Sequence, residues 1–202
     1  YENASGAINI KNTTYNNQDS SYKFEDFDIV SSFEGAERTI SINSPDIIDG
    51  KIKGRFRTRD ILKLVENSVG SIYTNYVPND VEEGQYIDFR FNIYSKIAAV
   101  FFKDLTLGKN TFIEGRLETE EKGFDFTFNS PEIKFKDYFA NNINVSIDNR
   151  NPLFNTFIEI DSLSAGVYNA SQFSLINVTK RDTLLIKSEF KGGKNNRDNY
   201  NL

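Results

Sequence analysis

Residues 123–148 carry the clearest pattern of apolar and polar positions in the chain. Phe124, Phe126 and Phe128 alternate with polar residues, which is the two-residue period of a strand with one apolar face. The alternation is interrupted at Asn-Ser-Pro (129–131) and then resumes. Because proline has no backbone N–H to give to a ladder, we expect a corner, a bulge or a sheet edge here, with a corner between two strands as the main prediction.

The same alternation recurs through most of the sequence and predicts a mainly β fold. A second Asn-Ser-Pro step, at 43–45, follows another apolar-faced strand. After residue 104 the pattern predicts strands at about 105–108, 111–119, 123–129, 132–136, 142–149, 154–161, 165–170, 172–179 and 183–190.

Two five-residue segments place a glycine between apolar residues of the same strand face. Gly54 lies in Ile-Lys-Gly-Arg-Phe (52–56), and Gly115 lies in Ile-Glu-Gly-Arg-Leu (113–117). Glycine at such a position leaves room for a neighbouring backbone or a large side chain to approach.

An amphipathic helix is expected at about 59–75, with Thr58 as its N-cap, and a short helical turn at about 96–103. The residues that we predict to cover the apolar mouth of the sheet share one arc at helical spacing: Ile61, Leu62, Val65, Val69 and Ile72.

Composition favours a single β-rich domain over residues 1–202. The chain is 38% hydrophobic and 14% aromatic, and this is enough apolar material for a sizeable core. It contains 18 Phe but no Trp, Met, Cys or His. The sequence starts without methionine, and we expect it to be a piece of a longer protein. No run of 18 apolar residues is present that would predict a membrane-spanning helix.

Catalytic and metal chemistry find little support in these residues. Without cysteine and histidine, thiolate catalysis and the usual transition-metal sites are excluded. Acidic pairs such as Asp26 and Asp28 fall mostly at outward strand positions without a calcium-loop spacing. We therefore expect no enzyme activity, no cofactor and no metal site. The net charge of −5 argues against nucleic acid as a partner.

What remains is the apolar face itself, which is either the core of a closed β-sandwich or the lining of an open groove. A sandwich would favour a carbohydrate- or protein-binding adhesion module. The open alternative is favoured by the many large side chains with few small partners. The candidate groove lining consists of Ile52, Phe56, Ile87, Phe89, Phe91, Ile113, Leu117, Phe124, Phe126, Phe128, Ile133, Phe135, Ile143, Val145, Ile147, Ile158, Ile160, Leu184 and Ile186.

Three segments resemble the TamB family (translocation and assembly module), which belongs to the AsmA-like superfamily of envelope proteins. They are ISINSPDIIDGKIKGRF (40–56), which leads directly into the predicted helix, NTFIEGRL (110–117) and RDTLLIKSEFKGG (181–193). The resemblance covers residues 20–193 and rests on short motifs.

The resemblance implies an elongated β-sheet trough, curled like a taco, whose apolar wall carries phospholipid acyl chains between the inner and outer membranes. It also implies a periplasmic location, an inner-membrane anchor outside this piece and an outer-membrane β-barrel assembly partner. It brings no catalytic residue with it. Two tripeptides, at Asp-Ser-Leu (161–163) and Asp-Thr-Leu (182–184), resemble an O-glycosylation pattern of exported Gram-negative proteins and make Ser162 and Thr183 candidate glycosylation sites.

Overall fold

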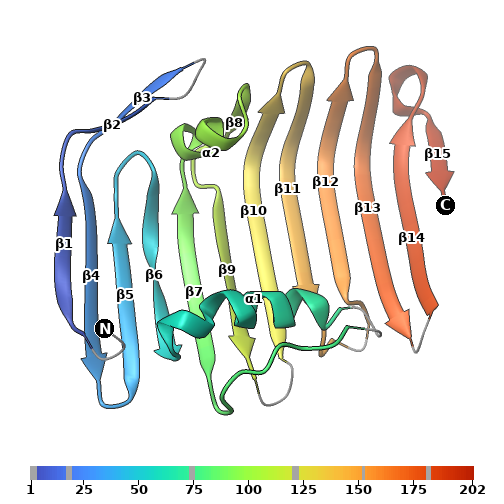
Figure 1. The fold of residues 1–202 in the computed structure, drawn as a ribbon. Helices are drawn as coiled ribbons and strands as arrows, with labels where there is room; N and C mark the ends of the chain where they lie inside the picture. Colours follow the sequence, from blue (N-terminus) through green and yellow to red (C-terminus); the bar gives the residue numbers. More distant parts are fainter. Residues whose placement is uncertain (1–3, 17–19, 73–75, 120–122, 152, 181–182) are drawn as a thin grey trace.

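The computed structural model describes residues 4–16, 20–72, 76–119, 123–151, 153–180 and 183–202. Within these ranges, thirteen strands form one open antiparallel sheet that does not close into a barrel (Figure 1). The order across the sheet is β1 (Gly6–Ile10), β4 (Phe27–Glu34), β5 (Glu37–Asn43), β6 (Ile48–Arg55), β7 (Tyr86–Ile93), β9 (Phe112–Glu118), β10 (Phe124–Phe135), β11 (Tyr138–Asp148), β12 (Thr156–Ala165), β13 (Tyr168–Lys180), β14 (Thr183–Gly192) and β15 (Asp198–Asn201).

The remaining elements lie at the ends of these strands. β8 (Leu105–Leu107) pairs with one end of β10, and β2 (Thr13–Asn16) and β3 (Ser21–Phe24) form a separate two-stranded hairpin. This hairpin is too small to be the second layer of a β-sandwich. The predicted mainly β fold is confirmed as a single sheet, and the sandwich alternative is not the architecture of the described residues.

Both expected helices are present, but the first is shorter than predicted, and its N-cap is Asp60 and not Thr58. A 3-10 turn (Thr58–Asp60) leads into α1 (Ile61–Gly70), and α2 spans Ser95–Phe101. α1 ends at Gly70, and Ser71 and Ile72 form a turn, so the helix stops before the predicted end at residue 75, a position that lies outside the described residues. In the view of Figure 1, α1 crosses the lower ends of the central strands, and α2 lies at the upper ends of β7 and β9.

Strand register lines up apolar residues across the sheet. One row of directly opposed residues crosses eleven strands, from β1 to β14: Ile8, Ile29, Ile42, Gly50, Phe91, Ile113, Phe128, Val145, Ile158, Leu175 and Ser188. Directly opposed residues share a face of the sheet. We call this apolar face the inner face. Lys51, Arg90 and Glu114 form a row of the opposite, outer face.

The glycines of the two five-residue segments lie on the inner face, as their spacing predicted. A Cβ atom on Gly115 would be 2.2 Å from the carbonyl oxygen of Asp125 and 3.0 Å from Cζ of Phe89. Phe89 and Phe126 both oppose Gly115 in register, and their ring centroids are 6.5 Å apart. The absent side chain therefore lets two large rings meet over the glycine.

The two Asn-Ser-Pro steps differ in structure. At the first, the predicted corner is confirmed, because a turn joins β5 to β6 and the Ser44 N–H donates to the Ile48 carbonyl at 3.0 Å. At the second, the predicted corner is wrong, since β10 continues from Phe124 to Phe135. The neighbour of β10 changes there from β9 to β8, so Pro131 interrupts neither pairing.

Local hydrogen bonds hold the second step extended. The Ser130 hydroxyl is buried, lies 2.7 Å from the Thr111 hydroxyl and donates to the Glu132 carbonyl at 2.8 Å. The break predicted between the strands at 165–170 and 172–179 is also wrong. β13 continues through it with a register shift between Ser171 and Ser174, and Gln172 takes a φ of 52°.

The packing over Gly115 gives a stability prediction. Gly115→Ala should lower the free energy of unfolding by about 1–3 kcal/mol, because the new methyl group overlaps the neighbouring backbone. Gly6→Ala is the matched control, since nothing lies within 4 Å of its added Cβ. Urea unfolding of both variants measures the difference. Equal stabilities would show that the sheet adjusts freely at Gly115.

Candidate functional site

The inner face has a closed part, next to α1. Here Phe56, Ile87, Leu117 and Phe124 are buried around Leu64 of α1. These four residues were predicted to line a groove, but they form the packed core beneath the helix. The reason is that α1 follows β6 directly and places Leu64 onto the ends of β7, β9 and β10.

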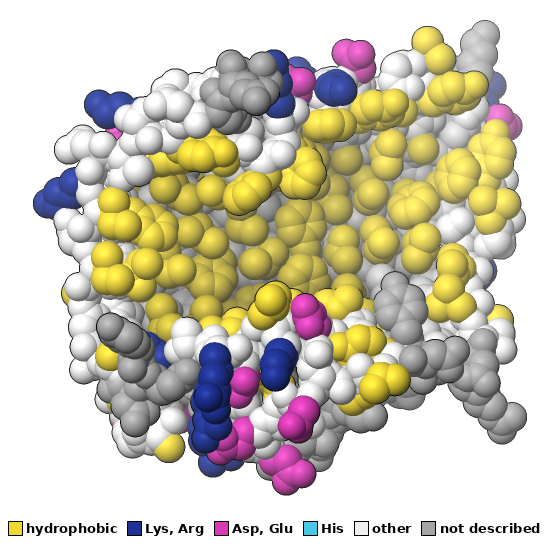
Figure 2. All heavy atoms as spheres, in the orientation of Figure 1, with side chains coloured by type: hydrophobic (Ala, Val, Ile, Leu, Met, Phe, Trp, Pro, Cys, Tyr) yellow, Lys and Arg dark blue, Asp and Glu magenta, His cyan; other side chains and the backbone are white. Residues whose placement is uncertain are grey.

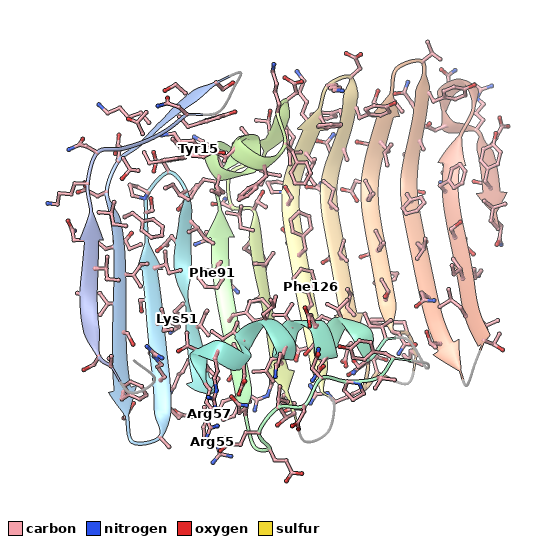
Figure 3. All side chains as sticks on the ribbon, in the orientation of Figure 1. Tyr15, Lys51, Arg55, Arg57, Phe91 and Phe126 are labelled. Carbon is pink, nitrogen blue, oxygen red and sulfur yellow. The ribbon has the colours of Figure 1, made fainter. Side chains whose placement is uncertain are left out.

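The rest of the inner face is open. Figure 2 shows a hollow lined almost continuously by hydrophobic side chains above α1. Figure 3 marks Phe91 on β7 and Phe126 on β10 within this region. The lining residues that are half-buried although they are large and apolar include Ile52, Phe89, Ile113, Phe126, Phe128, Val145, Ile147, Ile158 and Ile160. In the described part of the chain, no second sheet packs over them.

The other predicted lining residues are either buried within the inner face or lie at its margins. Phe91 and Ile143 are buried within the face. Ile133 and Phe135 lie beyond Pro131, towards the upper end of β10. Leu184 and Ile186 lie on β14 near the far edge of the sheet, and both are exposed.

The predicted orientation of α1 is wrong in part. Leu64, which was not predicted to cover the sheet, is only 2% exposed, whereas Leu62 is 67%, Val65 40% and Val69 47% exposed. Ile61 and Ile72 do pack against the core. The apolar arc is therefore wider than the surface that it covers, so one flank packs on the sheet and the other stays exposed.

Helical geometry sets the direction of this exposed flank. Asn67 lies on the opposite side of α1, at 100° per residue. Its side chain donates to the Asn79 carbonyl at 2.9 Å and accepts from the Tyr76 hydroxyl at 3.0 Å, which ties that side to the loop before β7. The flank formed by Leu62, Val65 and Val69 consequently faces away from the loop. In Figure 1 the loop runs below α1 and the central strands continue above it, so we infer that this flank borders the open inner face.

At the other end of the strands, α2 and the β2–β3 hairpin form a second rim. The Tyr22 hydroxyl donates to the Ala99 carbonyl at 2.9 Å, and the Lys96 ammonium donates to the Lys23 carbonyl at 2.9 Å. Lys96 also pairs with Asp46. The open hollow thus has a helix at each end of its central strands.

The outer face carries the charges. Arg116 pairs with Asp88 through one nitrogen, Nη1, which lies 2.8 Å from each oxygen of the carboxylate. Burial raises the pKa of the Asp125 carboxyl, and Arg150, 3.4 Å away, opposes this shift. These are ion pairs along neighbouring strands, and they stabilise the face that is turned away from the hollow.

A separate cavity of about 570 Å³ lies between α1, the loop before β7 and the end of β9. Asn67, Asn79 and Tyr76 line it, and their side chains hydrogen-bond to one another. These bonds fix the loop against the helix, which gives the polar residues of the cavity a structural role.

The remaining candidate sites are not brought together. Ser162 accepts a hydrogen bond from Asn141 at 2.9 Å within the sheet, and Thr183 is exposed at the start of β14. Glycosylation of either residue stays a prediction. In the described ranges, no three acidic residues gather as they would around a metal ion, and no helix has the length and apolarity needed to cross a bilayer.

The sheet and its hollow define a class of architecture: an open antiparallel sheet with one apolar face and helices at its rims. No protein-family model, curated protein or solved structure matches the chain.

Sequence reasoning missed Leu64 and extended the groove too far towards the helix. The signal was present, because Leu64 lies three residues after Ile61 and four before Ser68, which is also buried. The predicted arc was centred on the most apolar positions, whereas the packed side of α1 is centred on Leu64 and Ser68.

Substitutions on the packed and exposed sides of α1 should differ in their effect on stability. Leu64→Ala should lower the free energy of unfolding by about 2–5 kcal/mol, because it empties a packed position. Val65→Ala should change it by no more than about 0.5 kcal/mol, as is usual at the surface. Chemical denaturation of both variants measures this. A larger loss for Val65→Ala than for Leu64→Ala would reverse our orientation of α1.

Proposed function

We propose that this chain is a non-catalytic lipid-binding segment whose inner face holds the acyl chains of phospholipids. The observation that carries the proposal is the open, half-buried apolar surface over β6, β7 and β9 to β12, with no covering layer among the described strands. A continuous apolar surface of this size that is exposed to water is typical of a binding site for an apolar partner.

The chemistry of the surface fits an acyl chain better than a compact ligand. Burial of each CH₂ group contributes about 0.8 kcal/mol without any directional bond. The half-buried apolar lining crosses six neighbouring strands, β6, β7 and β9 to β12, or roughly 24 Å at about 4.8 Å per strand spacing. One leaflet of a bilayer has a hydrocarbon depth of about 15 Å, so the lining is long enough for a complete acyl chain laid across the strands.

The resemblance to the TamB family extends this proposal to the cell. In that setting the segment belongs to a longer periplasmic protein, anchored in the inner membrane and reaching the outer membrane, that carries phospholipids and assists a β-barrel assembly partner. The single open sheet and its helix after β6 support the comparison. A sugar- or protein-binding adhesion module has no comparable support, because its sandwich scaffold is not the fold described.

Fatty-acid binding tests the proposal. The protein should bind a fluorescent fatty acid at concentrations below the critical micelle concentration of that fatty acid. The double variant Val65→Asp, Val69→Asp should weaken this binding by about tenfold or more, because it puts charges beside the buried chain. Both positions are exposed, so the fold should persist in circular dichroism.

The matched control is Val77→Asp, which makes the same chemical change at an exposed valine beyond α1. It should bind the fatty acid as the unmodified chain does. Absence of binding in the unmodified chain, or equal affinities in all three proteins, would contradict an acyl-chain site on the inner face.

A further inference from the structure

Exposed apolar side chains gather at one edge of the sheet. In Figure 1 this is the upper edge, where the β10–β11 and β12–β13 hairpins turn and where α2 leads into β8. Phe101, Phe102, Tyr138, Val167 and Tyr168 are all exposed there, with Val167 at 91% and Tyr168 at 78%. Phe135 lies at the same end of the strands and is 36% exposed.

Strand register shows that this edge is straight. Leu105 opposes Phe135, Phe135 opposes Tyr138, Tyr138 opposes Ala165, and Ala165 opposes Tyr168. This single row ends five neighbouring strands, so it extends over four strand spacings, or roughly 19 Å. The connecting turns, including Lys136-Asp137 and Gly166-Val167, project beyond it together.

From this arrangement we propose that the upper edge docks onto the surface of a lipid bilayer. We name the edge residues Phe101, Phe102, Phe135, Tyr138, Val167 and Tyr168 the aromatic rim. Aromatic side chains with nearby lysines are typical of the membrane–water interface, where rings lie at the headgroup level and long amines reach water. Lys103 and Lys136 have this position in the rim, and the Lys136 ammonium lies 5.4 Å from the centre of the Phe135 ring.

The shape of the rim favours a bilayer over a second protein. A stable protein interface buries about 800 Å² on each partner in a patch of matching shape. The rim is a narrow line of separate turn tips, so it offers little such area. A fluid bilayer requires no complementary shape and accepts each tip independently.

The charge at the rim also predicts which vesicles bind. Lys103 and Lys136 are each followed by an aspartate, Asp104 and Asp137, so the tips are close to neutral. Ring burial is then the driving force, and neutral phosphatidylcholine should be sufficient. The opposite edge mixes Arg55, Arg57 and Lys63 with Asp80, Glu82 and Glu83 in and around the loop before β7, so it presents a charged surface in place of exposed rings.

Vesicle flotation tests this inference. The unmodified chain should float with phosphatidylcholine vesicles. The triple variant Phe102→Ser, Tyr138→Ser, Tyr168→Ser should lose about tenfold or more in partitioning, since three exposed rings are removed. The control Val77→Ser, Leu153→Ser removes two equally exposed apolar side chains away from the rim and should float normally. Unchanged flotation of the triple variant would overturn the proposal.

A second measurement does not depend on how the triple variant folds. Because the chain contains no tryptophan, Tyr168→Trp and Val77→Trp give single reporters, one on the rim and one away from it. With vesicles of brominated phosphatidylcholine, only the Tyr168→Trp emission should shift to the blue and be quenched. Equal quenching of both reporters, or none, would contradict docking through the rim.

Fatty-acid binding and vesicle flotation of the two sets of variants distinguish docking through the rim from acyl-chain binding by the inner face. The triple rim variant should still bind a monomeric fatty acid, and the Val65→Asp, Val69→Asp variant should still float. Light scattering tests whether a second copy of this chain, and not a bilayer, binds the aromatic rim. A concentration-dependent dimer that the triple variant loses, with no flotation of the unmodified chain, would assign the rim to a second copy of this chain and reject the bilayer.

Discussion

The structure depends on one constraint: an antiparallel ladder places opposed residues of neighbouring strands on the same face. With apolar residues at alternate positions, eleven strands produce a continuous apolar face across one sheet. A face of this kind normally packs against a second layer. Here the covering elements are α1 and α2, which lie at the ends of the strands and leave the middle open.

The closed part of the inner face is a packed core at one end of the strands that form the open part. Leu64 of α1, with Phe56, Ile87, Leu117 and Phe124, forms a small packed core at one end of the central strands. Ile52, Phe89 and Phe126 of the neighbouring lining pack against this core, so the closed part holds the start of the hollow in place. Ion pairs such as Arg116–Asp88 add contacts between the same strands on the outer face.

Much of this fold could be predicted from local patterns, because a two-residue period and a 3.6-residue period are properties of short segments. The alternation in 123–148 predicted strands that are present, and the arc from Ile61 to Ile72 predicted α1. The corner at Pro131 was wrong because proline is disruptive only where a partner needs its N–H. That depends on the switch from β9 to β8, which involves residues distant in sequence.

The candidate site was harder to predict for the same reason. Whether Phe124 lines a groove or fills a core depends on where α1 lies, and alternation assigns Phe124 and Phe128 to the same face without distinguishing them. Leu62 and Leu64 likewise have the same hydropathy but opposite exposure. Sequence periodicity identifies a face, whereas the contacts of neighbouring elements decide which part of that face stays open.

The position of the irregular residues connects the inner face with the upper edge. In β10 the apolar positions change phase between Phe128 and Ile133, across the Asn-Ser-Pro step. At the same level, Asn142 of β11 and Gln172 of β13 have φ values of 49° and 52°. Irregular residues of this kind re-aim the side chains that follow them. Asp161 of β12 is likewise skipped in the register with both neighbours, so the four adjacent strands β10 to β13 change phase along one line. Hydrophobic side chains continue above this line to the ends of the strands (Figure 2). The irregularity therefore lets a single apolar surface extend from the packed core beneath α1, through the hollow, to the edge of the sheet.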